Sequence, residues 1–444
     1  MSNQTPSISA DPLSNERLPK VDSRRNVFAI TGDILFFVTA TYFISPTTVL
    51  VGLASKLTDD KVLIGAIGTA WTAMWFLPQL FAAQVVRGKR RQKKYVTIPG
   101  IIGRQSFLLF ALWLWMTNAS QPVLTVWLLL AAISIFNLCD ALSGVAWFDM
   151  LARAFTPRRR GRVMVFAQMT ASFIGIGVGL LIERILRPDG LPFPQNFALV
   201  IFCAWFFMTI SLISFMTLEE IPMSESIIDH GSNVSLLGSL RDVFKSNVMF
   251  RRLLLARLLT GFEAMAATFY LVFAKEKLKL DDSAVGIFTL ALTIGAIGGL
   301  IIFGWLNERF GPRRVIHAST TFQMVAPALA LLVAAVPSIA LQSPAIGLAI
   351  FIVVMGLRGA IEHSLILGFV GYVMDAAPEQ HRAMYVGTVN TVGGIVALAP
   401  VMGGLIIQQL SGISGNNVAY SVVFGLTTLC VGLGWLLSLR LPKL

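Results

Sequence analysis

Long apolar runs, separated by short charged or turn-rich segments, dominate the chain. An α-helix needs about 20 apolar residues to cross the hydrocarbon core of a bilayer, and each of these runs is at least that long. The pattern predicts twelve membrane-spanning helices, at residues 26–54, 62–86, 97–117, 122–152, 163–183, 196–217, 253–274, 284–306, 315–337, 344–374, 384–409 and 418–438. The expected fold class is therefore an all-α polytopic membrane protein.

Composition supports this interpretation and excludes a soluble globule. Of the 444 residues, 55% are hydrophobic and 13% are charged, against roughly 25% charged in an average soluble domain. The net charge of +12 would suggest a nucleic-acid partner in a soluble protein. Here 25 of the 35 Lys and Arg fall on one face of the predicted topology and 7 on the other. This bias predicts that both termini are cytoplasmic, in the plasma or inner membrane, and that the charges meet anionic lipid and no nucleic acid.

The spans divide into two sets of six around the longest connection. Residues 1–25 have no long apolar run and are expected to form a disordered cytoplasmic tail. Residues 26–217 and 253–438 are expected to form two six-helix bundles, joined by a cytoplasmic linker at 218–252, and 439–444 is the cytoplasmic C-terminus. Within the linker, an apolar stripe predicts a helix that lies in the membrane interface, or alternatively a short helix packed on the bundle.

Internal similarity supports a duplicated six-span unit. The run Gly-Lys-Arg-Arg at 88–91, after the second span, matches Gly-Pro-Arg-Arg at 311–314, after the eighth, at an offset of 223. Asp140 in the fourth span and Glu362 in the tenth are 222 residues apart. Both pairs fall at equivalent points in the order of spans, so the two halves are expected to be pseudo-symmetric.

The loop after the eighth span carries the most specific motif. It consists of Gly304, Glu308, Arg309, Gly311, Arg313 and Arg314. This arrangement resembles the loop signature of the major facilitator superfamily, with Glu308 in the place of the usual Asp, and the resemblance extends over residues 26–438. It implies two six-helix bundles that rock about a central site lined by the first, fourth, seventh and tenth spans, and a gating role for this loop.

The junction of the fourth and fifth spans also looks like that of many prokaryotic members of the superfamily. It runs from Trp147 to the basic cluster that follows Pro157. Asp149 lies within reach of this cluster, so we expect an inner gate made of Asp149, Arg158, Arg160 and Arg162.

Ionisable residues inside spans are functional candidates, because a charge at mid-membrane costs about 2.5 to 3.5 kcal/mol on insertion scales. Eight of the ten lie in the first, fourth, seventh and tenth spans. The ten are Asp33, Arg104, Asp140, Asp149, Glu183, Arg257, Glu263, Arg358, Glu362 and His363. Their clustering predicts a polar cavity along these four spans.

Asp140 and Glu362 are the leading candidates for substrate binding or proton coupling, since both lie near mid-span. The alternative for Glu362 is a structural pair with Arg358, four residues earlier on one helix face. Asp33 with Arg104 is a candidate cross-helix pair, and Arg257 is expected either to bind an anion or to reach lipid phosphate. The remaining cavity candidates are Glu263, His363, Asn137 and Trp147, the last two on one face of the fourth span or else simply packing residues.

These features predict a secondary active transporter that moves a small organic solute by alternating access. Proton coupling and a preference for efflux are finer hypotheses, and a transporter-like membrane sensor or a lipid translocase is the alternative. The four His and three Cys are scattered without a catalytic or metal-binding spacing, so we expect no enzyme activity, metal or cofactor. The expected partners are membrane lipid and the solute, and the expected state is a monomer.

Overall fold

The computed structural model describes residues 21–86, 89–222, 248–336, 343–362, 364–376 and 382–442, and in these residues every regular element is a helix. Ten of the helices are long and apolar enough to span a membrane, and three further apolar helices are shorter. Each of the twelve predicted spans coincides with one of these helices or with a broken series of them. The all-α membrane fold is thus confirmed.

Eight helices make up the N-terminal half. They are α1 (Arg24–Phe43), α2 (Val49–Leu57), α3 (Lys61–Phe76), α4 (Gln79–Val86), α5 (Lys93–Thr117), α6 (Pro122–Ala154), α7 (Pro157–Ile185) and α8 (Gln195–Met216). Two predicted spans are interrupted here, the first between α1 and α2 and the second between α3 and α4. Pro46 and Pro78 lie in these interruptions, where a residue without an amide hydrogen cannot continue the helical hydrogen bonding.

The C-terminal half is more broken. Its helices are α10 (Val248–Gly261), α11 (Glu263–Ala267), α12 (Tyr270–Leu278), α13 (Ala284–Phe310), α14 (Pro312–Ala335), α16 (Pro344–Ala360), the π-helix η3 (Leu365–Val370), α17 (Gly371–Ala376), α18 (Arg382–Val396), α19 (Ala399–Ser414) and α20 (Asn416–Leu439). The predicted seventh span is three helices, and the tenth stops as an α-helix at Ala360. Irregular backbone at membrane depth exposes polar groups, and it is tolerated where it lines a protein cavity.

Several predicted boundaries were wrong by four to six residues, and two of them bear on the basic motifs. The fifth span was expected to start at residue 163, but α7 begins at Pro157, a residue favoured at the first helical position. The eighth span was expected to end at 306, but α13 continues to Phe310. Both basic motifs therefore begin on regular helices instead of in loops.

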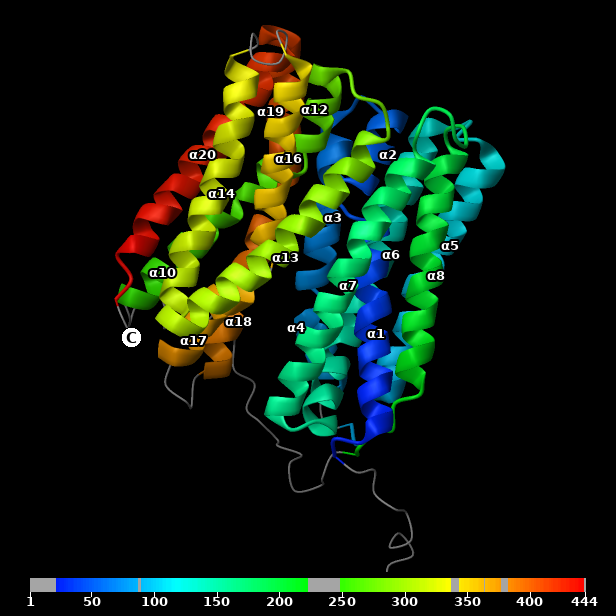
Figure 1. The fold of residues 1–444 in the computed structure, drawn as a ribbon, viewed down its shortest axis with the longest axis vertical. Coiled ribbons are helices and arrows are strands. Elements are labelled where there is room, and N and C mark those ends of the chain that lie inside the picture. Colours follow the sequence, from blue (N-terminus) through cyan, green and yellow to red (C-terminus); the bar gives the residue numbers. More distant parts are fainter. Residues whose placement is uncertain are drawn as a thin grey trace, which may run out of the picture.

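The two halves stand side by side in Figure 1 and meet along two helix pairs, α7 with α13 and α3 with α19. Close approach at both seams depends on glycine. A Cβ added at Gly65 would lie 2.4 Å from the carbonyl oxygen of Pro400, and one at Gly286 would lie 2.2 Å from the backbone nitrogen of Glu183. Small residues are what allow helices to pack closely in a membrane, where no hydrophobic effect drives them together.

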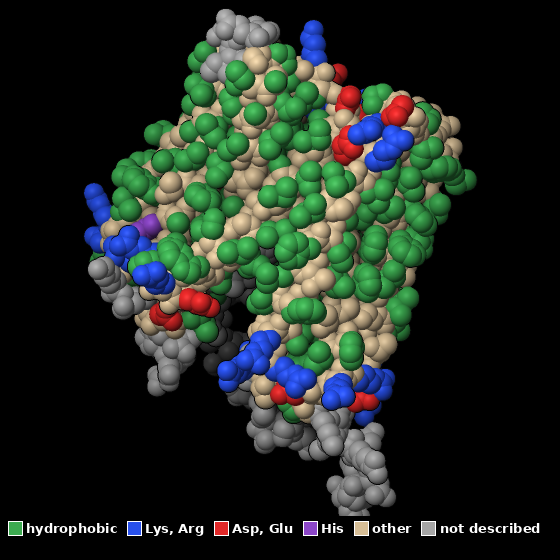
Figure 2. Space-filling model, viewed as in Figure 1, with side chains coloured by type: hydrophobic (Ala, Val, Ile, Leu, Met, Phe, Trp, Pro, Cys, Tyr) green, Lys and Arg blue, Asp and Glu red, His purple; other side chains and the backbone are tan. Residues whose placement is uncertain are grey.

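Charge separates the two ends of the molecule. Figure 2 shows Lys and Arg side chains gathered at the lower end, below walls that are largely hydrophobic. We call this the basic end and the other the opposite end. The first helix begins and the last helix ends at the basic end (Figure 1). The same end shows a hollow between the two halves in Figure 2.

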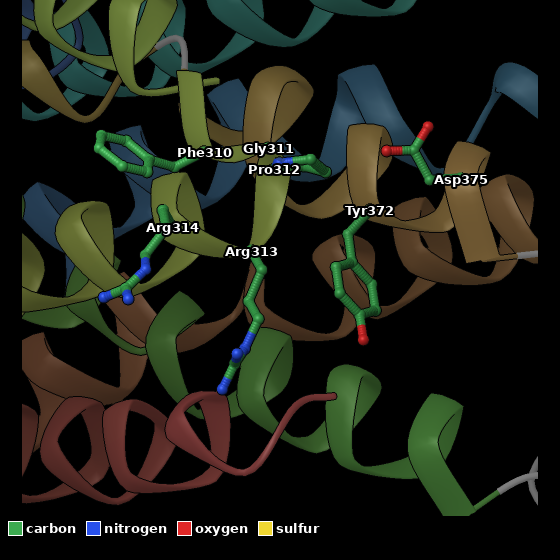
Figure 3. A pocket seen from close by; sticks show the side chains of 7 residues that line it. All are labelled: Phe310, Gly311, Pro312, Arg313, Arg314, Tyr372 and Asp375. Atoms are coloured by element: carbon green, nitrogen blue, oxygen red, sulfur yellow. The ribbon is translucent and has the colours of Figure 1, made fainter. Parts of the chain in front are cut away.

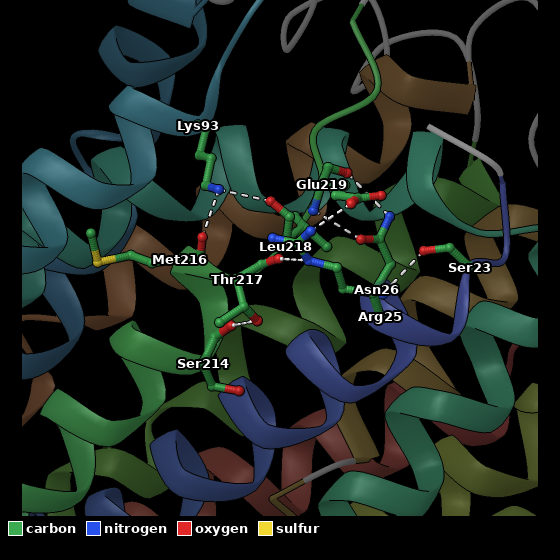
Figure 4. Close-up of polar contacts among 9 residues, drawn as sticks. All are labelled: Ser23, Arg25, Asn26, Lys93, Ser214, Met216, Thr217, Leu218 and Glu219. Atoms are coloured by element: carbon green, nitrogen blue, oxygen red, sulfur yellow. Dashed lines mark hydrogen bonds and ion pairs between the residues drawn. The ribbon is translucent and has the colours of Figure 1, made fainter. Parts of the chain in front are cut away.

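The first residues of the predicted linker are held against the basic end of the N-terminal half (Figure 4). Arg25 Nη1 pairs with Glu219 at 2.6 Å, and the Asn26 side chain exchanges two hydrogen bonds with the Glu219 backbone. Lys93 Nζ donates to the carbonyl oxygens of Met216 and Leu218, at 2.7 Å each. The predicted interfacial helix, most of the predicted tail and residues 443–444 lie outside the described residues.

Candidate functional site

A cavity of about 160 Å³ lies between the two halves, near the middle of the molecule. We call it the central cavity. The N-terminal half contributes hydroxyls and rings from α1, the α1–α2 turn and α3, whereas the C-terminal half contributes the charged side chains. Its lining is Thr41, Tyr42, Ser45, Pro46, Thr47, Gly68, Trp71, Thr72, Ala264, Ala267, Thr268, Leu292, Arg358, Glu362 and Pro400.

An ion pair lies at the edge of the central cavity. Arg358 Nε is 3.5 Å from Glu263 Oε2, and Glu263 is only 6% exposed. The second carboxylate oxygen of Glu263 and the hydroxyl of Tyr270 are buried without a hydrogen-bond partner in the described part of the chain. Buried polar atoms are nearly always paired in folded proteins, so these two atoms mark a place where a ligand group or water is expected.

Glu362 lines the cavity but does not form the predicted i, i+4 pair with Arg358. That prediction required one continuous helix, and α16 ends at Ala360, which places Glu362 in the turn that follows. The ion pair of Arg358 is instead with Glu263, from a different predicted span. Glu362 is thereby left exposed at the cavity. His363, its predicted companion, lies outside the described residues.

The N-terminal half contains a second charged network, centred on Asp33. Ser211 Oγ donates to Asp33 Oδ1 at 2.6 Å, and Trp147 Nε1 donates to Oδ2 at 2.8 Å. Arg104 reaches this network through Ser211 Oγ, at 3.3 Å. The predicted Asp33 and Arg104 partners are thus joined through a serine, and Trp147 holds Asp33 instead of standing free as a pocket wall.

Asp140 lies in the same half but is not part of the cavity lining. Its Oδ2 accepts a hydrogen bond from Trp75 Nε1 at 3.1 Å. Asn137, the predicted neighbour on the pocket wall, is buried and donates its side-chain amide to the carbonyl of Ile133 on its own helix. The equivalence of Asp140 and Glu362 in sequence therefore does not extend to their surroundings, because only Glu362 faces the cavity.

The loop motif is arranged around a second cavity, of about 320 Å³, at the basic end (Figure 3). Gly311 joins α13 to α14 with a φ of 77°, a conformation that favours glycine. Arg313 and Arg314 line the cavity with Tyr372 and Asp375, and Arg313 also donates to the carbonyl of Leu439. The motif thus ties the α13–α14 turn to the end of α20.

The other motif residues lie on α13. Glu308 is exposed, and the Arg309 guanidinium lies over the rings of Trp305 and Phe310, at 5.8 and 5.5 Å. Gly304 has open space where a Cβ would stand. These contacts all lie within α13, so they do not test the predicted gating role of the loop.

The predicted inner gate is arranged differently from expectation. The ion pair found for Asp149 is with Arg153, one turn further along α6, at 3.0 Å. Arg158 and Arg162 line a surface cavity of about 470 Å³ beside Asp22, and Arg160 lies between them on the first turns of α7. The early start of α7 explains this, since it turns the basic cluster into helix positions that point in different directions.

The two halves are latched at the opposite end. Lys61 Nζ pairs with Glu276 at 2.5 Å, Lys56 pairs with Asp282 at 3.2 Å, and Gln408 accepts from the Lys61 amide at 3.0 Å. Sequence reasoning missed these pairs. The four charged residues were visible in the loops as unlike charges on one face, but nothing in the sequence showed which loops would meet. These contacts join the two halves at the opposite end.

The fold of the chain is similar to that of proteins with solved structures. A crystal structure of a D-xylose-proton symporter superposes with a TM-score of 0.67 at 12% identity, covering 94% of this chain and 98% of that one. The nucleoside transporter NupG superposes with a TM-score of 0.65 at 14% identity, covering 94% and 99%. The sequence pattern of the Major Facilitator Superfamily matches residues 253–443. This match covers the C-terminal half of the chain, and the similarity in fold to the two transporters extends over 94% of it.

The many helices long and apolar enough to span a membrane, together with this match, make this a multi-pass membrane protein. A relative with a described substrate is the gentisate transporter of Corynebacterium glutamicum, which is 28% identical over 157 residues. This match covers 35% of the present chain and 32% of that relative's length. The match over residues 253–443 and the fold thus agree with the resemblance seen in the loop motif.

Proposed function

We propose that this protein is a secondary active transporter that carries a small organic solute across a membrane, with the central cavity as its binding site. The observation that carries the proposal is the position of that cavity. It lies between two bundles that are latched at the opposite end and separated by a hollow at the basic end. A site between two bundles becomes accessible from either side when the bundles rock against each other.

The size and chemistry of the cavity support a solute of about one ring. A dry cavity of about 150 Å³ holds a benzene molecule in a well-studied protein, and the central cavity measures about 160 Å³. Tyr42 and Trp71 offer rings for stacking, hydroxyls such as Thr41 and Thr72 offer hydrogen bonds, and Arg358 offers a cation. Gentisate, the solute named for the relative, is an aromatic acid, which makes aromatic acids the first class to test.

Glu362 is the proposed coupling group, because its carboxylate faces the cavity and no ion pair holds it in the described part of the chain. A carboxylate that alternates between a wet and a closed environment binds a proton in one state and releases it in the other. Asp140, the other predicted candidate, has a tryptophan donor and a position outside the cavity, so we assign it no part in coupling.

The cavity lining removes the physical reason for preferring export. That preference rested on an apolar cavity with few charges, whereas the lining contains six hydroxyl-bearing side chains besides Arg358 and Glu362. We therefore propose neither import nor export as the direction of transport.

The test uses purified protein reconstituted in liposomes, with radiolabelled gentisate, benzoate, xylose and uridine and an imposed pH gradient of either sign. We expect uptake of at least one solute, driven by one sign of the gradient, and loss of that drive in Glu362→Gln. The orientation of the protein, fixed by protease accessibility, then gives the direction. Liposomes that take up none of the four solutes above the protein-free rate would contradict the proposal.

A further inference from the structure

Arg257 is a cation inside the molecule that has no acidic partner in the described part of the chain. It lies on α10, its Nε is buried without a hydrogen-bond partner, and no ion pair is found for its guanidinium. Its contact is instead with the ring of Phe369, whose centroid is 5.8 Å from Cζ. The other arginines placed within the spans have polar contacts, Arg104 with Ser211 and Arg358 with Glu263.

Arg257 as a whole is half-buried, with its Nε buried. A cation without an acidic partner at membrane depth is costly, and in membrane proteins such charges mark ion or substrate pathways. Lipid phosphate does not explain this one. A Cβ built at Gly393 would lie 3.5 Å from one Arg257 Nη and 3.3 Å from the ring of Phe76, so the guanidinium sits beside α18 and close to the other half. Arg257 thus points between the two halves, and the sequence-based alternative of a side chain that reaches the lipid surface is not what the contacts favour.

The surroundings of Arg257 continue the wall of the central cavity toward the basic end. Three stretches of chain line the cavity and then run to this arginine: α3 from Trp71 to Phe76, α11 and α10 from Ala264 back to Arg257, and α19 and α18 from Pro400 back to Gly393. The hollow between the halves opens at this end (Figure 2). A solute that moved from the central cavity toward the basic end along these stretches would come near the guanidinium.

The chemistry of this position selects a class of solute. A guanidinium with free N–H groups binds a carboxylate through two parallel charge-assisted hydrogen bonds. Phe369 and Phe76 add aromatic faces beside it, against which a flat ring packs. Gly393 lets α18 approach Phe76 and Arg257 closely, since a Cβ there would lie 3.3 and 3.5 Å from them.

We infer that Arg257 binds the carboxylate of an aromatic acid at a second subsite, between the basic-end hollow and the central cavity. This inference rests on the proposed transport function and deepens it, because it names the substrate class and a residue that recognises it. The subsite is distinct from the cavity cation Arg358, which is already paired with Glu263.

The test measures binding of benzoate and of its uncharged analogue benzamide to the purified full-length protein, by equilibrium dialysis and by thermal shift. Wild-type protein is expected to bind benzoate more tightly than benzamide. Arg257→Met is expected to weaken benzoate binding about tenfold or more and to leave benzamide binding unchanged, since one charge-assisted contact is lost. Arg257→Lys keeps the charge but cannot form two parallel hydrogen bonds. Its affinity for benzoate is therefore expected to lie between those of wild type and Arg257→Met.

The matched control is Arg252→Met, which removes an exposed arginine from the same helix and should leave both affinities unchanged. The melting temperature of the ligand-free protein shows whether Arg257 acts in ligand binding or in the stability of the fold. Because Arg257 has no acidic partner among the described residues that its loss would leave unpaired, Arg257→Met should melt at the wild-type temperature or above it, while its benzoate-induced shift is lost. An Arg257→Met protein that melts lower and yet binds benzoate normally would show a structural role and overturn the inference.

Two further outcomes separate this inference from the proposed function. Wild-type protein that transports xylose or uridine but binds benzoate no better than benzamide overturns the aromatic-acid subsite and leaves the transporter proposal intact. Uptake of none of the four solutes overturns the transporter proposal, whereas a benzoate preference that depends on Arg257 would still support the subsite.

Discussion

The two halves of the molecule treat their intramembrane charges differently. In the N-terminal half, both oxygens of Asp33 accept hydrogen bonds, from Ser211 and Trp147, and Asp140 accepts one from Trp75. In the C-terminal half, Glu263 has one oxygen without a partner, and Arg257 has no acidic partner in the described part of the chain. The charged groups that line the central cavity, Arg358 and Glu362, also come from this half.

The difference suggests a division of labour between the two halves. The N-terminal half uses its charges to hold its own helices together, while the C-terminal half leaves polar atoms available to a solute. The breaks in the two halves also differ in what they contain, since the seventh and tenth spans are interrupted where Glu263 and Glu362 stand, whereas those of the N-terminal half contain Pro46 and Pro78. Interrupted helices supply polar groups at membrane depth, which is where a transporter needs them.

The largest effect is expected when one member of the Arg358–Glu263 ion pair in the C-terminal half is removed. Arg358→Met leaves Glu263 buried without its cation, and we expect the free energy of unfolding to fall by about 3 kcal/mol. Adding Glu263→Gln should recover most of this loss, because the uncompensated charge is gone. Chemical denaturation of detergent-purified protein measures both, with Arg251→Met as the exposed control on α10. Equal stability of Arg358→Met and wild type would contradict the pairing.

The N-terminal network should respond through stability alone. Asp33→Asn replaces a charged acceptor of two hydrogen bonds with a neutral one, and the expected cost is about 1.5 to 3 kcal/mol. Because Asp33 is not part of the cavity lining, the solute affinity of the folded fraction should stay at its wild-type value. A large change in affinity with unchanged stability would place Asp33 in the binding site and remove the distinction between the halves.

The latch at the opposite end joins the two halves. Removing it should lower the stability less than the two changes above. The side chains of Lys61 and Glu276 are 11% and 36% exposed, so water screens part of their attraction. A double-mutant cycle with Lys61→Met and Glu276→Gln should give a coupling free energy of about 0.5 to 1 kcal/mol. A coupling near zero would mean that the close contact contributes nothing to the closed end.

The exposed pair of Arg184 and Asp189 lies outside both networks, and its loss should have the smallest effect on stability. It also serves as the reference for the pH dependence of stability. The hydrogen bond from Arg184 lowers the pKa of Asp189 below its usual 3.8. A carboxyl with a lowered folded-state pKa stabilises the protein above its unfolded pKa, and this contribution is lost as the pH falls through the folded value. The melting temperatures of wild type and Asp189→Asn should therefore differ by a constant amount from pH 5 to pH 8. A difference that changes within that range would contradict the assignment.

Most of the fold could be predicted from the sequence, since twelve apolar runs are a direct consequence of bilayer thickness. The helix breaks were harder. Pro46 and Pro78 are visible signals, but nothing local announces the end of α16 at Ala360, and that end removed the predicted pair of Arg358 and Glu362. The sequence thus placed the charged residues in the correct spans but did not show which of them are in contact.

Contacts between helices explain the rest of what the sequence did not reveal. The pairing of Arg358 with Glu263 joins two spans, and the donors to Asp33 come from two others, so each depends on packing that a single chain pattern does not encode. Ser211 and Trp75 were missed because a serine or tryptophan in an apolar run has many structural uses. Sequence symmetry also misled, because it treated Asp140 and Glu362 as equivalent.

The central claim is that the binding site draws its charges from the C-terminal half. Solute affinity of Glu362→Gln and Asp140→Asn, measured side by side in the same detergent with the solute that wild-type liposomes take up, tests it most directly. We predict that Glu362→Gln changes the affinity or its pH dependence at least severalfold, while Asp140→Asn binds like wild type. Normal binding in Glu362→Gln together with lost binding in well-folded Asp140→Asn would contradict the account.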